Sequence, residues 1–306
     1  MIRRAFLRHT IVSSIGASLL PWEVFSANAE FSQITILHTN DMHSRIDPFP
    51  MDGGRNQGMG GVVKRAAMID EIRKEKENVL LLDAGDVFQG TPYFNFFHGE
   101  VEVKAMSEMK YDLCTIGNHD FDGGIENLAM QMGKASFTML SSNYDFSNTA
   151  MQGVAKDYMT YEMDGVKIGV YALGIELQGL VPAELYGETQ YMDPLAVAIK
   201  YEKRLRKDEK CDYVICLSHL GYKYGSEKVS DLVIAANTFE TDLVIGGHTH
   251  TFMKEPDVVI NQKGDRVLVN QVGFAGLMLG RIDLVFEKNK KGNCTSCQNT
   301  WLGKIV

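Results

Sequence analysis

Short apolar runs that end in polar residues recur five times along this chain. The runs cover positions 34–37, 79–82, 113–116, 214–217 and 243–245. Apolar runs of this length that include β-branched residues predict buried strands. Ligand sites in α/β sheets gather at the carboxyl ends of the strands. We therefore expect the polar residues after these runs to meet at one rim of a sheet.

The residues that follow the runs are of types that bind metal ions. They are Asp41 and His43, Asp86, Asn118 with His119, His219, and His248 with His250. Carboxylate, amide and imidazole groups suit several divalent metals, and the set contains no thiolate. It is large enough to hold two metal ions, which indicates a metallohydrolase. The donor types are compatible with Mn, Zn, Fe, Co or Mg and select none of these.

The spacing of the histidine motifs suggests how the ligands are presented. In an extended strand, residues i and i+2 point the same way, so Asp41 and His43 are expected to lie on one edge of a strand end. His248 and His250 repeat that spacing. Asp86 is expected to bridge two ions.

Paired ions would explain the remaining polar residues of the motifs. Two ions about 3.5–4 Å apart can hold both a hydroxide nucleophile and the oxygens of a phosphoester. Asn118 would add a neutral oxygen ligand. The neighbouring His119 is then free to act on the substrate rather than on a metal.

The segments between the runs alternate between helical and strand patterns. Helical spacing of apolar residues predicts helices over 60–76, 100–109, 125–132 and 194–207. Asp164-Gly165 predicts a hairpin between strands at 159–163 and 166–173, and short strands are expected at 258–260, 266–270 and 279–286. Strands inside and helices outside predict an α/β fold, a four-layer α-β-β-α sandwich in one domain over 30–306. The irregular segment 44–61 follows the first motif and is expected to hang over the site, as a lid or as a plain surface loop.

The first 29 residues have the layout of a secretory signal peptide. Arg3 and Arg4 precede a mildly apolar stretch, and Ala27-Asn28-Ala29 resembles a cleavage site. The twin arginine resembles a Tat signal, and the alternative is a cytoplasmic start or an uncleaved anchor. The apolar stretch is shorter than the ~20 residues that span a bilayer. We therefore expect an exported, periplasmic protein without a membrane anchor.

The net charge excludes one class of partner. The chain has a formal net charge of −8, and removal of a leader with three Arg and one Glu leaves −10. Such an acidic chain lacks the basic surface that binds a nucleic-acid polymer. Any phosphate must then be held by a local positive field, which bound metal ions supply.

Some residues of reactive type are not assigned to the site. His38 is expected to hydrogen-bond within a strand-end turn, His98 belongs to a helix approach, and His9 lies in the leader. Cys294 and Cys297 form a CxxC pair that is too small for a structural zinc site. In an oxidising compartment this pair can form a local disulfide.

The ordered motifs resemble those of the calcineurin-like metallophosphoesterases. The matching residues are Asp41-x-His43, Gly85-Asp86, Gly117-Asn118-His119-Asp120, His219 and Gly247-His248-x-His250. Within that superfamily, the residues from Ile36 to Asp41, from Gly85 to Thr91 and from Gly117 to Asp122 are similar to signatures of the 5′-nucleotidase family.

The resemblance implies roles for the metal-ligand residues of these motifs and for His119. Asp41, His43, Asp86 and His250 would hold one ion, and Asp86, Asn118, His219 and His248 the other. A His–Asp dyad, here His119 and Asp122, would assist the phosphoryl step next to Asn118. An ionised Asp122 favours the imidazolium form of His119, which can stabilise charge or protonate the leaving oxygen.

The resemblance also implies a substrate and a partner. It predicts attack of a metal-bound hydroxide on a nucleoside monophosphate, a nucleotide sugar, a 2′,3′-cyclic nucleotide or a related small phosphoester. The family's C-terminal domain, which holds the base, is expected to be absent from this chain, and a separate chain could supply it. Two alternatives remain, namely a hydrolase of a sulfur-containing anion ester and a subunit that depends on a partner for activity.

Overall fold

Two six-stranded sheets form the centre of the computed structural model, which describes residues 31–287 and 293–303. The first sheet contains β1 (Phe31–Thr39), β2 (Val79–Asp83), β3 (Leu113–Cys114), β4 (Thr138–Met139), β13 (Met278–Glu287) and β14 (Asn293–Trp301). The second contains β6 (Tyr158–Met163), β7 (Val166–Leu173), β9 (Tyr213–Ser218), β10 (Leu243–Ile245), β11 (Asp257–Ile260) and β12 (Arg266–Asn270). β5 (Tyr144–Asp145) and β8 (Gln190–Tyr191) form a small separate pair.

The strand order places the carboxyl ends of several strands at one rim of each sheet. The orders are β14-β13-β1-β2-β3-β4 and β11-β12-β10-β9-β7-β6. β1 to β4 are mutually parallel in the first sheet, and β7, β9, β10 and β12 are parallel in the second. The loops that follow these strands therefore all begin at the same end of their sheet.

Alternation of side chains along the strands builds three apolar layers. In β2, Leu80 and Leu82 face the space between the sheets, whereas Leu81 packs toward the helices. In β9, Ile215 faces the other sheet and Val214 faces the helices on the opposite side. Strands that are apolar on both faces are covered on both faces, as expected for parallel strands.

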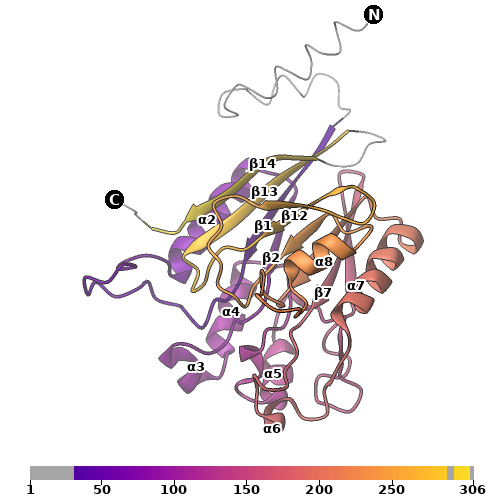
Figure 1. Ribbon diagram of the computed structural model, residues 1–306. Helices are drawn as coiled ribbons and strands as arrows, with labels where there is room; N and C mark the ends of the chain where they lie inside the picture. The colour runs from indigo at the N-terminus through magenta and orange to yellow at the C-terminus, as the bar shows by residue number, and fades with distance from the viewer. Residues whose placement is uncertain (1–30, 288–292, 304–306) are drawn as a thin grey trace, which may run out of the picture.

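Helices cover the outer face of each sheet (Figure 1). They are α2 (Val62–Glu75), α3 (Pro92–Phe97), α4 (Glu100–Glu108), α5 (Ile125–Met132), α6 (Ala183–Tyr186), α7 (Pro194–Lys203) and α8 (Asp231–Asn237). Residues of α2, α4 and α5 pack on the first sheet, and residues of α7 and α8 pack on the second. The predicted four-layer α-β-β-α sandwich is confirmed. Among the described residues, no helix has the length and apolar character needed to cross a bilayer.

Several boundaries differ from the sequence-based expectation for local reasons. The strand predicted over 113–116 ends at Cys114, and the helix predicted from 60 begins at Val62, after Gly60 and Gly61 with φ of 70° and 89°. The helix predicted over 194–207 becomes a π-helical turn at Arg204–Asp208. The predicted leader over 1–29 lies outside the described residues.

Candidate metal centre

The predicted ligands meet where the carboxyl ends of the two sheets face each other. Asp41 and His43 follow β1, Asp86 follows β2, and Asn118 follows β3 in the first sheet. The second sheet contributes His219 after β9, and His248 and His250 after β10. Donor atoms of the two sheets lie close together, and Asp86 Oδ2 of the first sheet is 3.1 Å from His219 Nε2 of the second.

The backbone at these ligands is not extended. The expectation that Asp41 and His43 share one edge of an extended strand end was therefore wrong. Asp41 and His43 have φ of 51° and 47°, and His248 and His250 have φ of 69° and 52°. β1 ends at Thr39, so the ligands lie in tight left-handed turns beyond the strands. These turns separate His248 from His250, so each histidine joins a different group of ligands.

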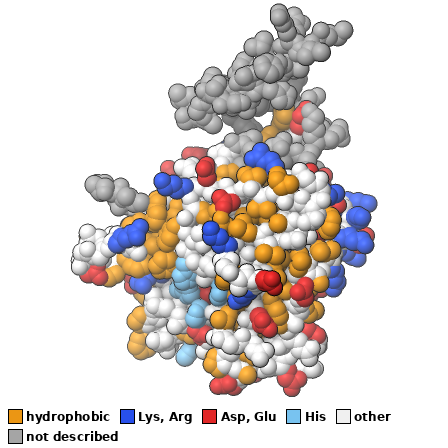
Figure 2. Space-filling model, viewed as in Figure 1, with side chains coloured by type: hydrophobic (Ala, Val, Ile, Leu, Met, Phe, Trp, Pro, Cys, Tyr) orange, Lys and Arg blue, Asp and Glu red, His pale blue; other side chains and the backbone are white. Residues whose placement is uncertain are grey.

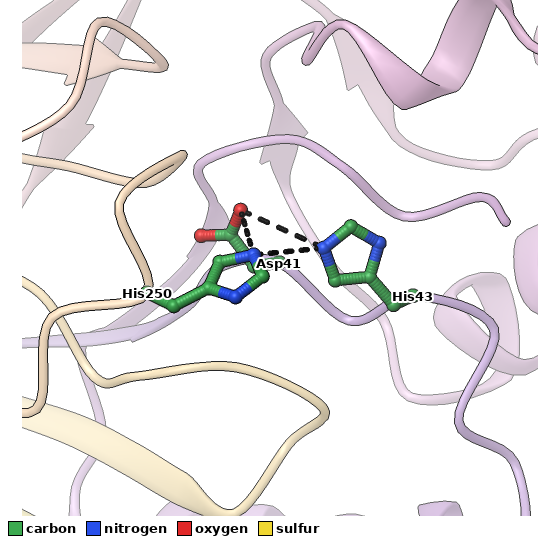
Figure 3. A group of neighbouring side chains, drawn as sticks. All are labelled: Asp41, His43 and His250. Carbon is green, nitrogen blue, oxygen red and sulfur yellow. Dashed lines mark hydrogen bonds and ion pairs between the residues drawn. The ribbon is translucent and has the colours of Figure 1, made fainter. Parts of the chain in front are cut away.

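The first group consists of Asp41, His43 and His250, whose donor atoms lie within 4.8 Å of one another. His43 Nε2 lies 2.9 Å from His250 Nε2, and Asp41 Oδ1 lies 3.3 Å from His250 Nε2 (Figure 3). Asp41 is fully buried, whereas the His250 side chain is 39% exposed. The group therefore opens to solvent on the histidine side, where histidine side chains are visible at the surface in Figure 2.

The second group consists of Asp86, His219 and His248, and Asn118 lies beside it. Asn118 Oδ1 is 2.8 Å from His248 Nδ1. Asp86 Oδ2 lies 3.1 Å from His219 Nε2 of this group and 3.9 Å from His43 Nε2 of the first group. One carboxylate oxygen thus faces both groups, as expected for a bridging ligand.

The hydrogen bonding of His219 is that of a metal ligand. His219 Nε2 is fully buried and makes no hydrogen bond, although it lies 3.1 Å from Asp86 Oδ2. Its other nitrogen, Nδ1, donates to the carbonyl oxygen of Ala84 at 2.6 Å. A metal-binding histidine typically donates its second ring N–H to such an acceptor, so the orphaned Nε2 is oriented as a ligand.

The charge balance also indicates a place for cations. Burial disfavours the imidazolium of His219, but the charges of Asp86 and Asp41 outweigh burial and raise its pKa to about 10. The carboxylates around the centre therefore attract positive charge strongly, and divalent cations would supply it without protonating a ligand.

Backbone groups and amide side chains fix the two aspartates. The backbone N–H of His248 donates to Asp41 at 3.0 Å, and Asn40 Nδ2 donates to the same carboxylate at 2.6 Å. The N–H of His119 donates to Asp86 Oδ1 at 2.8 Å. Gly85, with φ of 88°, permits this packing because a Cβ there would lie 2.6 Å from the nitrogen of Gly117.

Asp120 is a residue to which the sequence analysis gave no role. Its carboxylate accepts four backbone N–H groups, those of Asp86, Val87, Phe88 and Gly117. It therefore joins the loop after β2 to the loop after β3. Its place in the Gly117-Asn118-His119-Asp120 motif was the only sequence signal for this role.

His119 and Asp122 form the predicted dyad next to the two groups. His119 Nδ1 lies 2.8 Å from Asp122 Oδ2, and the His119 side chain is 38% exposed. The hydrogen bond to Asp122 raises the pKa of His119, partly opposed by burial. The His119 and His43 rings lie 5.4 Å apart, so the dyad is adjacent to the first group.

The residues left out of the site lie apart from it or have other partners. His38 is buried and pairs with Asn270, and burial lowers the pKa of His38 to about 3. His98 ends α3 at an exposed position. Cys297 is disulfide-bonded, while the side chain of Cys294, its predicted partner, lies outside the described residues.

The 44–61 loop projects to the side and leaves histidines visible at the surface in this view (Figures 1 and 2).

Comparison with known proteins agrees with this geometry. The chain is 32% identical to a snake venom 5′-nucleotidase of Crotalus adamanteus over 85% of its length and 46% of that protein. It is 30% identical to human 5′-nucleotidase over 94% of its length and 51% of that protein. It thus spans about half the length of these curated relatives.

A solved structure and a family profile give the same result. The 5′-nucleotidase precursor of Thermus thermophilus superposes with a TM-score of 0.80 at 29% identity, covering 89% of this chain and 55% of that chain. The profile of the calcineurin-like phosphoesterases matches residues 34–252, which include every residue of both ligand groups. The chain therefore belongs to the calcineurin-like phosphoesterase family.

Proposed function

We propose that this chain is an exported two-metal phosphoester hydrolase of the 5′-nucleotidase type. The observation that carries the proposal is the position of Asp86 Oδ2 between the two ligand groups. The partly exposed His119 lies beside these groups. Relatives of this chain are named 5′-nucleotidases, so the proposed substrates are nucleotides and related small phosphoesters.

The proposed ligands divide into two sets that share Asp86. Asp41, His43, Asp86 and His250 would hold one ion, and Asp86, Asn118, His219 and His248 the other. Two bound divalent ions supply Lewis-acid polarisation of the phosphate oxygens and lower the pKa of water. The buried backbone donors on Asp41 and Asp86 hold both carboxylates in place before any ion binds.

His119 is the proposed acid and electrostatic group, and Asp122 is its positioning residue. Asp122 accepts the hydrogen from Nδ1, which leaves Nε2 of His119 to face the substrate. As an imidazolium, His119 stabilises charge on the phosphoryl oxygens or gives its Nε2 proton to the leaving oxygen. Asn118, which follows β3 next to His119, would contact both the second ion and the phosphate.

A release assay on the purified chain tests this proposal. AMP, a 2′,3′-cyclic nucleotide, p-nitrophenyl phosphate and p-nitrophenyl sulfate are supplied after loading with Mn²⁺, Zn²⁺, Fe²⁺, Co²⁺ or Mg²⁺. We expect metal-dependent phosphate release that His119→Ala strongly reduces. Release of sulfate alone would assign the site to another anion ester, and no release with any metal would overturn the proposal.

Export is the part of the proposal that rests on residues 1–29. The twin arginine resembles a signal for transport of folded proteins, which would allow metal to bind before export. The double variant Arg3→Lys, Arg4→Lys should therefore retain precursor in the cytoplasm, as measured by fractionation and immunoblotting. Normal maturation of the double variant outside the cytoplasm would contradict this route.

A further inference from the structure

Four aromatic rings form a continuous row that begins at the candidate metal centre. His250 stacks on Phe274, with ring centroids 5.1 Å apart and planes 15° apart. Phe274 meets Phe252 edge to face at 5.8 Å, and Phe252 stacks on Trp301 at 5.2 Å and 15°. We call these four residues the aromatic row. They come from three separate segments, namely the loop after β10, the loop between β12 and β13, and the end of β14.

The aromatic row is partly open to solvent. Phe252 is 42% exposed, and Phe274 and Trp301 are each partly exposed. The backbone of Gly273 fixes the Phe252 ring, because a Cβ at Gly273 would lie 2.1 Å from that ring. In Figure 2, hydrophobic side chains gather beside the surface histidines. The hydrophobic core does not need these exposed aromatic side chains, and they lie next to the candidate metal centre.

The position of His250 connects this surface to the phosphate site. Its Nε2 lies 3.3 Å from Asp41 Oδ1, where the first ion is expected. Its ring face lies against Phe274. On the His250 side of the metal centre, Phe274 and Phe252 are the aromatic side chains that a group attached to a bound phosphate would meet. Aromatic faces bind planar rings by stacking and discriminate little between different bases.

We propose that the aromatic row is a subsite for the planar ring of the substrate, a nucleobase or an aryl group. This inference rests on the proposed phosphoester hydrolase function and adds to it the side chains that would recognise the ring of the substrate. The subsite selects phosphoesters that carry an aromatic or heterocyclic ring over aliphatic ones. Stacking is its means of recognition, so it distinguishes adenine from uracil far less than it distinguishes a ring from a glycerol group.

Substrate preference gives the first test. The ratio of kcat/KM for AMP to kcat/KM for glycerol phosphate is measured for the unchanged chain and for Phe252→Leu. Leucine retains apolar packing but removes the aromatic face, so the ratio should fall ~10-fold, a typical loss for one stacked base. Phe96→Leu is the matched control, since Phe96 is 76% exposed on α3 and lies outside the row. An equal ratio for Phe252→Leu and the unchanged chain would overturn the subsite.

Ligand binding without catalysis gives the second test. The chain has two tryptophans, Trp22 in the predicted leader and Trp301 in the aromatic row, so a Trp22→Phe variant reports on Trp301 alone. Adenosine carries no phosphate, so it is not hydrolysed. In the metal-loaded protein it should quench Trp301 fluorescence saturably, ribose should not, and Phe252→Leu should weaken the effect.

The outcomes separate this inference from the proposed function. Absence of quenching by adenosine in a chain that hydrolyses phosphoesters overturns the subsite and leaves the function intact. Saturable quenching in a chain that hydrolyses none of the tested phosphoesters supports the subsite and overturns the function. A change in Trp301 emission on dilution without adenosine would show that the row is a contact between copies, which also overturns the subsite.

Discussion

At the level of single residues, the sequence predicted which side chains meet but not how they are presented. Asp41 and His43 were expected on one edge of an extended strand, yet both have positive φ in turns beyond β1. Left-handed backbone is uncommon outside glycine, although aspartate and histidine adopt it more readily than bulky residues. A two-residue spacing alone does not distinguish these conformations. The contacts that hold the turns, such as the N–H of His248 on Asp41, come from distant parts of the chain.

The shared position of Asp86 predicts a loss of both metal binding and activity on its removal. Asp86→Ala deletes the oxygen that lies between the two ligand groups. Bound metal should fall from two ions towards one or none, and phosphoester hydrolysis should be abolished. Elemental analysis of the purified variant alongside steady-state rates provides the measurement. Two retained ions with near wild-type activity would contradict the bridging assignment.

Substitution of His119 or Asp122 should give a different pattern, in which activity falls but the bound metal is retained. His119 belongs to neither ligand group, so His119→Ala should leave the metal content nearly unchanged. Its kcat should drop by ~10²–10⁴, the usual contribution of an acid–base or electrostatic group. Asp122→Asn should give a smaller fall, because Asp122 mainly orients the His119 ring. Loss of metal from His119→Ala with little change in rate would identify His119 as a ligand instead.

At the level of elements, apolar patterning predicted the strands and helices that carry the layers. β7, β10, β12 and α5 have the expected bounds, because alternation and helical spacing in these segments match their burial. α3, α8 and β14 were not predicted. α8 is only seven residues long, too short for helical spacing to stand out. β14 carries polar residues, and its place in the sheet comes from pairing with β13.

The hydrogen bonds that Asp120 accepts predict that its carboxylate stabilises two neighbouring loops. Asp120→Ala would leave four buried backbone N–H groups, from Asp86 to Phe88 and at Gly117, without their acceptor. Each buried donor left unsatisfied costs about 1–3 kcal/mol, so urea unfolding should show a large loss of stability. Asp145→Ala is the matched control, since Asp145 accepts the N–H of Ser147 at an exposed position. Equal losses for the two variants would show that burial of the Asp120 contacts is unimportant.

At the level of the whole molecule, the candidate centre joins the two sheets. One sheet supplies Asp41, His43, Asp86 and Asn118, and the other supplies His219, His248 and His250. The order of strands within each sheet was not predictable from the strand patterns, because strand order depends on pairing between distant segments. The convergence of the ligands was predictable, because carboxyl ends of parallel strands share a rim. A ligand set divided between two sheets links metal binding to the stability of the whole fold.

Metal removal should therefore destabilise the protein measurably. A ligand that binds only the folded state at 100 times its Kd adds about 2.7 kcal/mol of stability. At about 2–4 °C per kcal/mol for a chain of this size, Tm should rise by about 5–10 °C between EDTA and saturating metal. Differential scanning calorimetry provides the measurement. Asp86→Ala should show a much smaller rise, because the oxygen shared by both groups is gone. If the unchanged chain has the same Tm with EDTA and with saturating metal, the two sheets do not form a common metal site in the folded state.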